Sequence, residues 1–294
     1  MKIEEGVTLS RFTTLGTGGR ARAFARPETV DELQEALAFA SEQGVPVAVL
    51  GLGSNLLVAD GGFDGLALKL AGELAQVDVQ GELLMAGGGA PNAVALHRAR
   101  GAGLGGFEFA CAIPGTAGGG VWMNAGAYGG DWAGILERAL VVEGEGVEWR
   151  TADELGFSYR HSDLKHGQVV AQVEFRLTPR PAAEIKATVA DLQAQRKAAQ
   201  PTNRRTYGSV FKNPGHELSA GKMLEACGLK GHRIGGAQIS PRHANFIENA
   251  DRARSAHAIA LMTEARRRAW EQFGVELQHE VEFLGAIELP SIAR

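Results

Sequence analysis

A glycine-rich stretch from Ile113 to Gly130, IPGTAGGGVWMNAGAYGG, is suited to holding a nucleotide pyrophosphate. Glycine has no β-carbon, so the backbone amides here can approach an anionic ligand that side chains would otherwise keep away. Large apolar residues such as Val121 and Trp122 favour burial and would hold this loop still. A tight glycine corner between two strands is the alternative, and composition alone leaves it open.

A second glycine-rich turn lies in GLGSNLLVA, at Gly51–Ala59, and is a candidate for a second pyrophosphate clamp. Ser54 and Asn55 add polar side chains to the free amides. A Rossmann phosphate loop would run into a helix and be followed by an acid about twenty residues later. Here Leu56 and its neighbours continue as a strand, so that fingerprint does not apply. A plain β-turn is the alternative.

Arg160 is the third candidate for chemistry, in the stretch FSYRHSDLK between an aromatic residue and a small hydroxyl residue. The planar fork of a guanidinium matches a carboxylate, so an arginine fixed in a turn can bind a carboxylate substrate. An arginine in a turn is most commonly a surface cation, and the residues alone slightly favour that interpretation.

Composition and charge exclude several classes of function. A net charge of −4 argues against a nucleic-acid surface, and no apolar run reaches the roughly twenty residues of a membrane helix. The start, MKIEEGVTLSRF, lacks the apolar core of a signal peptide. The two cysteines, Cys111 and Cys227, and the eight histidines show no metal-ligand spacing. We therefore expect a cytoplasmic protein, a monomer or weak oligomer, with no metal and no nucleic-acid or membrane partner.

Hydrophobic periodicity and turn residues predict helices and short strands along the chain, and the part after residue 199 is predicted to be a small α+β domain. The expected helices are Glu28–Gln43, Pro91–Arg100, Ala182–Ala199, Leu218–Cys227 and Ser255–Phe273. A single helical turn is expected at Asp153–Gly156. The expected strands are Pro46–Leu50, Leu66–Leu70, Gln76–Gln80, Leu83–Ala86, Ile135–Glu143, Val147–Arg150, Val169–Leu177, Ala237–Ser240, Ala244–Glu248 and Val275–Phe283. A change of composition after Gln200-Pro201 places a domain boundary near residue 199.

Six motifs stand in one order along the chain, and together they carry a resemblance to a known family. They are GLGSNLLV, IPGTAGGGVWMNAGAYG, YRHS, GSVFKNP, AGKMLEACGLKG with GGAQISPRHANFIEN, and LQHEVEFLG. Over about residues 10–285 the chain resembles the UDP-N-acetylenolpyruvoylglucosamine reductases, also called UDP-N-acetylmuramate dehydrogenases. The short spacings after Arg160 and after GSVFKNP resemble the shorter form of this family. That form lacks an inserted loop whose tyrosine covers the substrate, so no such tyrosine is assigned.

The resemblance implies a two-part FAD-binding domain of the vanillyl-alcohol-oxidase (PCMH) type and a small C-terminal α+β substrate domain. The implied boundaries are 1–70 and 71–198 for the two FAD subdomains and 199–294 for the substrate domain. The implied reaction reduces the enolpyruvyl ether of a UDP-sugar with NADPH, through FAD, for peptidoglycan synthesis. Residues 51–55 include no histidine, so the FAD is expected to be non-covalent.

The family's motifs assign three catalytic residues to this chain. Arg160 in YRHS would stabilise negative charge that develops on the substrate carboxylate. Ser209 in GSVFKNP would donate the proton to C2 of the enolpyruvyl group. Glu280 in LQHEVEFLG would assist beside that carboxylate in its protonated form.

The same motifs suggest which residues bind the cofactor and the substrate. For FAD they are Gly51, Leu52, Gly53, Ser54, Asn55, Leu56, Pro114, Gly115, Thr116, Gly118, Gly119, Asn124 and Gly126. For the substrate they are Tyr159, Arg204, Arg205, Lys212 and Asn213, although Arg204 and Arg205 are equally well interpreted as surface arginines.

Two other functions compete with this one. The first is a flavin-dependent carbohydrate or alcohol oxidase on the same FAD fold, which would use oxygen and need no C-terminal serine. The second is a nucleotide-sugar-binding regulator that keeps the fold without the chemistry. The set of Arg160, Ser209 and Glu280 argues against both.

Overall fold

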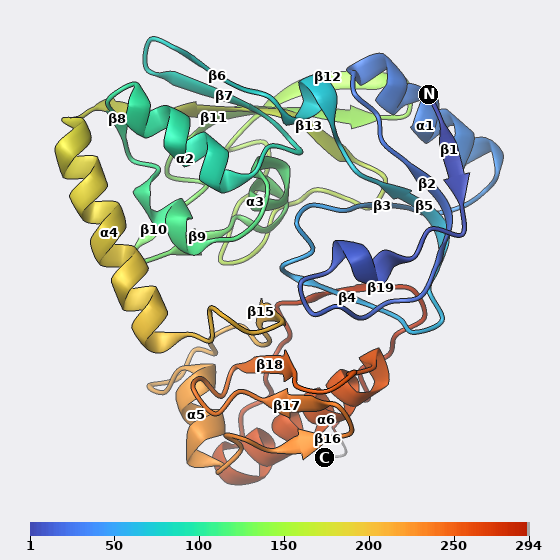
Figure 1. The fold of residues 1–294 in the computed structure, drawn as a ribbon, viewed down its shortest axis with the longest axis vertical. Coiled ribbons are helices and arrows are strands. Elements are labelled where there is room, and N and C mark those ends of the chain that lie inside the picture. The colour runs from blue at the N-terminus through green and yellow to red at the C-terminus, as the bar shows by residue number, and fades with distance from the viewer. Residues whose placement is uncertain (293–294) are drawn as a thin grey trace. The chain divides into compact units, whose positions relative to one another are not determined.

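The structure is a computed structural model that describes residues 1–292 (Figure 1). Its chain forms two compact units, each built from several segments. Unit 1 consists of Met1–Glu5, Arg22–Leu52 and Asp64–Arg196. Unit 2 consists of Gly6–Ala21, Gly53–Phe63 and the segment that begins at Lys197. The predicted boundary at residue 70 falls inside unit 1, whereas the one at residue 198 lies next to the change of unit between Arg196 and Lys197, and as domain limits both stay predictions.

Side-chain caps start three of the α-helices, α1, α3 and α5. The bounds of the α-helices are α1 Val30–Glu42, α2 Asn92–Gly101, α3 Ala117–Met123, α4 Ala182–Ala199, α5 Ala220–Ala226 and α6 Ser255–Phe273. Three short 3-10 helices are η1 Leu9–Phe12, η2 Gly72–Ala75 and η3 Glu108–Ala112. In α1 the side chain of Thr29 accepts a hydrogen bond from the Glu32 amide, and acids occupy the first turn.

Unit 1 contains two main sheets. The first has the order β1-β2-β5-β3 and the second, which is antiparallel, has the order β12-β11-β13-β7-β6. The first residues of β2 and β5, Ala21 and Phe63, belong to unit 2. The strands of unit 1 are β1 Ile3–Glu5, β2 Ala21–Ala25, β3 Val47–Val49, β5 Phe63–Leu68, β6 Val77–Gln80, β7 Leu83–Gly87, β8 Leu104–Gly105, β9 Gly126–Ala127, β10 Gly130–Asp131, β11 Leu136–Glu143, β12 Gly146–Thr151, β13 Val169–Arg176 and β14 Thr178–Pro179.

The five-stranded sheet of unit 1 buries both of its faces. Successive residues of a strand point to opposite faces, and Val141 and Val142 of β11 accordingly belong to two different hydrophobic clusters. One face packs with residues of α2 and α3, and the other packs with Leu33 and Leu37 of α1. Most residues of the central strand β13 are therefore apolar and buried.

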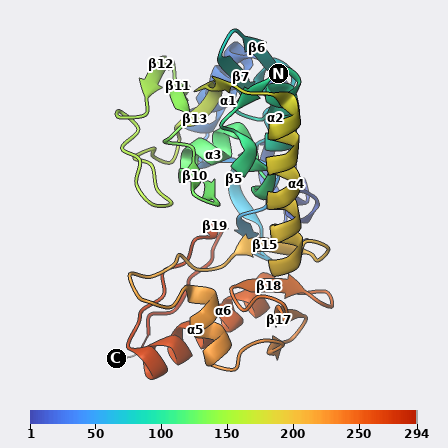
Figure 2. The same ribbon diagram turned by 90° about the vertical axis from the view of Figure 1, so that its left-hand side faces the viewer.

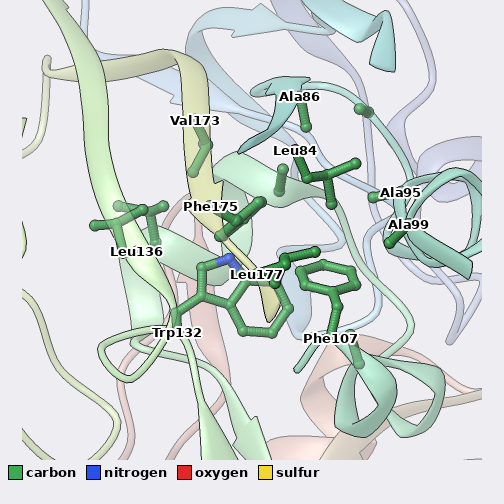
Figure 3. Close-up of a cluster of buried hydrophobic side chains, with 14 of the residues drawn as sticks. Leu84, Ala86, Ala95, Ala99, Phe107, Trp132, Leu136, Val173, Phe175 and Leu177 are labelled. Atoms are coloured by element: carbon green, nitrogen blue, oxygen red, sulfur yellow. The ribbon is translucent and has the colours of Figure 1, made fainter. Parts of the chain in front are cut away.

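An aromatic cluster forms the centre of the first of these cores (Figure 3). The Trp132 ring lies edge-on to Phe107, with 5.6 Å between ring centroids, and edge-on to Phe175 at 6.0 Å. All three side chains are fully buried. Edge-to-face pairs of this kind stabilise a core beyond the burial of their area.

Gly120 of α3 lies directly against the indole ring of Trp132, and a β-carbon built at Gly120 would overlap that ring. We expect Gly120→Ala to lower the free energy of unfolding by about 1–3 kcal/mol, the usual cost of overpacking a core. Gly101, at the end of α2, is the matched control, since a β-carbon there would meet nothing within 4 Å. Denaturant unfolding checks both variants. Equal stabilities of Gly120→Ala and Gly101→Ala would contradict this packing.

Unit 2 is a four-stranded sheet of order β15-β18-β17-β16 covered by helices. The strands of the sheet are β15 Thr206–Ser209, β16 Arg233–Ile234, β17 Ala237–Ile239 and β18 Phe246–Asn249. A separate parallel pair is formed by β4 Leu56–Val58 and β19 Glu282–Leu284. Helix α6 contacts β16 and β17, and α5 contacts α6 (Figures 1 and 2). Met223, Leu261 and Met262 of these helices are fully buried in the core of the unit.

Three local predictions are wrong. The glycine-rich stretch is not all loop, because Ala117–Met123 forms α3, whose first turn is capped by the Thr116 side chain. Residues 275–283 do not form one strand, because His279 makes only an isolated bridge with Phe211 and the strand paired with β4 is limited to Glu282–Leu284. Residues 153–156 form a hydrogen-bonded turn instead of a helical one.

Candidate functional site

The two glycine-rich segments meet in unit 1. A β-carbon on Gly51 would lie 3.0 Å from the side-chain oxygen of Thr116, so no larger residue fits at Gly51 without a shift. The same Thr116 oxygen accepts a hydrogen bond of 3.3 Å from the Gly119 amide. Two segments that the sequence predicts to bind one ligand therefore lie side by side.

Lys69 fixes the orientation of the Gly51 peptide by donating a hydrogen bond to its carbonyl oxygen. Burial, with the nearby Arg26 as a smaller cause, lowers the pKa of the Lys69 ammonium below its usual range. No sequence motif singles out this lysine. Its only signal was one cation inside the apolar strand end LALKL.

The YRHS turn of unit 1 is attached to the glycine-rich stretch by three hydrogen bonds. The side-chain nitrogen of Asn124 donates to the Ser158 carbonyl at 3.0 Å, and the Ser162 hydroxyl donates to the Trp122 carbonyl at 2.7 Å. The guanidinium of Arg160 donates to the Gly126 carbonyl at 2.6 Å. The structure thus brings Arg160 together with residues that the sequence predicts to bind the cofactor.

Arg160 has an unusual backbone, with a φ of 55°, which non-glycine residues adopt rarely. Its guanidinium carbon lies 5.2 Å from the centroid of the Tyr159 ring, within cation–π range. The Tyr159 side chain is about half exposed, at 54%. The bond to Gly126 and the aromatic ring together restrict the directions that the Arg160 fork can take, so the earlier surface-cation alternative loses support.

Unit 2 brings the remaining part of the Gly51–Ala59 turn close to the two C-terminal motifs. The side-chain nitrogen of Asn55 donates to the Glu280 carbonyl at 3.1 Å, and the backbone carbonyl of Asn55 accepts from the Glu282 amide at 3.0 Å. A β-carbon on Gly208, which precedes Ser209, would lie 3.3 Å from the Ser54 carbonyl oxygen.

Ser209 and Glu280 lie on adjacent segments of unit 2. The Glu280 amide donates to the carbonyl of Val210, the residue after Ser209, at 2.8 Å. One residue pair further along, the Lys212 amide donates to the Gln278 carbonyl at 2.9 Å. Both Ser209 and Glu280 are partly exposed. Two motifs far apart in the sequence are thus held in register by backbone hydrogen bonds.

The other predicted substrate residues of unit 2 have mixed surroundings. Asn213 accepts a hydrogen bond of 3.1 Å from the Ala220 amide at the start of α5, so part of its role is structural. Arg204, which is exposed, forms an ion pair at 3.9 Å with the buried Glu248, and Arg205 is also exposed. Their role in binding the substrate stays a prediction.

Thr14 of unit 2 is a further residue that the sequence analysis missed. Its amide donates to the Gly53 carbonyl at 3.0 Å, and its hydroxyl lies 2.6 Å from the Thr206 carbonyl. Gly53 has a φ of 66°, and a β-carbon there would collide with the Phe12 carbonyl. The stretch FTTLGTGG at 12–19 was the available signal, since it is also rich in glycine and threonine.

The glycine-rich segments of unit 1 fit an extended dinucleotide such as FAD. Gly51 packs closely on Thr116 and Gly118 on the Gly88 backbone, so neither position takes a β-carbon without a shift, and such glycine-rich backbone can present amides to a pyrophosphate. Among residues 1–292, no group of three or more histidine, cysteine, aspartate or glutamate side chains is arranged to hold a metal ion. No described helix is long and apolar enough to cross a membrane.

Comparisons with known proteins agree with this arrangement. Residues 21–151 match the FAD binding domain model, and residues 200–284 match the model of the UDP-N-acetylenolpyruvoylglucosamine reductase C-terminal domain. A reductase of this name from Sphingopyxis alaskensis is 42% identical over 98% of this chain and 96% of its own length. UDP-N-acetylenolpyruvoylglucosamine reductase 2 from Symbiobacterium thermophilum is 41% identical over 97% of this chain and 92% of its own. The chain belongs to the UDP-N-acetylenolpyruvoylglucosamine reductase family.

A solved structure supports the assignment to this family at the level of the fold. The crystal structure of UDP-N-acetylenolpyruvylglucosamine reductase from Thermus caldophilus matches with a TM-score of 0.85 and 38% identity, over 97% of this chain and 99% of that one. The predicted fold class, an FAD-binding domain followed by a small C-terminal α+β domain, is confirmed. The chain is an FAD-dependent oxidoreductase.

Proposed function

We propose that this protein reduces UDP-N-acetylglucosamine enolpyruvate to UDP-N-acetylmuramate, with NADPH as the hydride donor, in peptidoglycan precursor synthesis. The relatives' names support the substrate class, and the FAD-binding domain supports the redox chemistry. The observation that carries the residue assignment is the pairing of two motifs. Ser209 and Glu280 lie on segments joined by the Glu280–Val210 hydrogen bond.

The reaction needs both a hydride and a proton. FAD, which the glycine-rich segments at 51–56 and 114–126 are proposed to hold, would supply the hydride chemistry between NADPH and C3 of the enolpyruvyl group. Negative charge then develops at C2 and spreads into the carboxylate, so a fixed cation beside that carboxylate favours the transition state over the ground state. Arg160 is proposed for this role, because a guanidinium can form two parallel hydrogen bonds to one carboxylate.

Ser209 is proposed to donate the proton to C2 through its hydroxyl oxygen. A serine hydroxyl is a weak acid, so its effect depends on its position and on nearby positive charge. Lys212, three residues further on, is the nearest cation in the same motif and is proposed to favour the proton transfer or to hold the substrate. Glu280 is proposed to donate a hydrogen bond to the carboxylate in its protonated form, which a neighbouring anion favours.

An anaerobic titration tests this function. The protein is expected to purify yellow, to release all its flavin as FAD on heating or in acid, and to lose its flavin absorbance when NADPH is added. Addition of UDP-N-acetylglucosamine enolpyruvate should then restore the absorbance, with formation of a product two hydrogens heavier by mass spectrometry.

Three results would contradict the proposal. Flavin that stays on the denatured peptide would contradict non-covalent binding. A bleached protein that oxygen reoxidises but the enolpyruvyl sugar does not would favour an oxidase. A colourless protein that binds the UDP-sugar and ignores FAD would favour a nucleotide-sugar-binding regulator.

A further inference from the structure

A buried asparagine is bonded to the backbone next to Ser209. Asn245 precedes β18, and only 4% of its surface is exposed. Its side-chain oxygen accepts from the Phe211 amide at 3.0 Å, and its side-chain nitrogen donates to the Phe211 carbonyl at 2.8 Å. Its own carbonyl accepts from the Val210 amide at 2.9 Å. One residue therefore makes three hydrogen bonds to the segment that follows Ser209.

These hydrogen bonds continue the contact between β15 and β18 beyond Ser209, where the regular pairing of the two strands ends. Ser209 is the last residue of β15 and pairs with Phe246 of β18, after an irregularity in the register. Beyond this pair the two strands no longer form a ladder. The Asn245 side chain supplies a donor and an acceptor to the next peptide groups, as a strand partner would. A buried backbone group left without such a partner would be costly.

The same segment is held from its other side by the Glu280 motif. The Val210 carbonyl accepts from the Glu280 amide, and the Val210 amide donates to the Asn245 carbonyl. Val210 therefore lies between Asn245 and Glu280, and a movement of Asn245 would shift Ser209, the residue before Val210, relative to Glu280. Proton transfer depends steeply on such distances, since a displacement of about 1 Å can cost about 10²-fold in rate.

We propose that Asn245 is a positioning residue that fixes Ser209 for proton donation. This role rests on the proposed function, because it acts through Ser209 and makes no contact with the reacting atoms. An asparagine is required because its amide offers a donor and an acceptor at the same distance from the backbone. Aspartate has nearly the same shape, but its carboxylate accepts only and would face the Phe211 carbonyl with a negative charge.

Asn245→Asp tests this role by anaerobic stopped-flow measurement of the two half-reactions. Bleaching of the flavin by NADPH should keep its native rate within about twofold, since it needs no proton from Ser209. Reoxidation by the enolpyruvyl sugar at saturating concentration should slow by about 10-fold or more. The solvent deuterium isotope effect on reoxidation should rise, because proton transfer becomes the slower event.

Asn249→Asp is the matched control, since Asn249 lies at the end of β18 and also bonds the backbone twice. Its side chain donates to the Leu15 carbonyl at 2.9 Å and accepts from the Ala253 amide at 2.8 Å. It should lose stability without changing the ratio of the two half-reactions. If Asn245→Asp does not fold, Asn245→Gln keeps both groups and moves them by one methylene, and the same two rates decide.

The outcomes separate this role from the function on which it rests. Native protein that the enolpyruvyl sugar does not reoxidise overturns the proposed function and this role with it. Native protein that works, with both half-reactions of the Asn245 variant equally slowed or unchanged, overturns the positioning role alone. A further loss when Asn245→Asp is added to Ser209→Ala would also overturn it, because a residue that acts through Ser209 has no effect once that hydroxyl is gone.

Discussion

Ser209→Ala is expected to bleach with NADPH at close to the native rate and to be reoxidised by the enolpyruvyl sugar at least ~10²-fold more slowly. Reduction of the flavin requires hydride contact with NADPH but no proton at C2 of the substrate. Reoxidation requires the hydride and that proton together. The substitution removes only a hydroxyl, at a residue whose main chain is held by the pairing with Phe246. Anaerobic stopped-flow measures the two rates separately.

Ser219→Ala is the control for this experiment. Ser219 lies in the same unit, and its side chain caps α5 by accepting from the Lys222 amide. Its loss should cost about 1 kcal/mol of stability and leave both half-reactions unchanged. Equal slowing of both half-reactions in Ser209→Ala would indicate a disturbed flavin site or fold. Slowing of neither would mean that solvent or Lys212 delivers the proton.

Arg160→Lys is expected to lower turnover by roughly 10²-fold or more, which corresponds to about 3 kcal/mol of transition-state stabilisation. Lysine keeps the positive charge but loses the planar fork that bonds one carboxylate twice. It also loses the geometry that ties the Arg160 guanidinium to the Gly126 carbonyl. Steady-state assays with the enolpyruvyl sugar measure the change in kcat and KM.

Arg176→Lys provides the comparison for that variant. Arg176 forms two hydrogen bonds to Glu137, at 2.7 and 2.9 Å, on an exposed surface. An exposed ion pair contributes little, so turnover and stability should both stay near native. An Arg160→Lys variant with the same near-native turnover would make Arg160 a surface cation, and the carboxylate would need another partner.

Elements with a strong local signal could be predicted from the sequence. The predicted bounds of α4 and α6 are the observed ones, Ala182–Ala199 and Ser255–Phe273. Gly274 ends α6 with a φ of 65°, a conformation that glycine adopts without strain. Helix α3 was missed because glycine disfavours helices locally, whereas packing of Gly120 against Trp132 requires glycine there.

The candidate site divides in the same way. Arg160, Ser209 and Glu280 lie in motifs with recognisable letters, so a resemblance was enough to select them. Asn245 and Thr14 form hydrogen bonds with backbone carbonyl and amide groups of distant segments. Every residue carries such groups, so the sequence does not show which of them these side chains will contact. The motif that contains Asn245, PRHANFIEN, was noted as part of the resemblance, but the sequence offered no reason to assign its asparagine a role.

The surroundings of Trp132 also make its fluorescence a separate signal for the folding of unit 1. An indole enclosed by phenylalanine rings emits at shorter wavelengths than one in contact with water, and Trp132 is fully buried among Phe107, Phe109 and Phe175. Trp270 on α6 is the single tryptophan of unit 2. A chain that retains only Trp132 would therefore report the melting of unit 1 as a red shift in fluorescence, and a chain that retains only Trp270 would report unit 2.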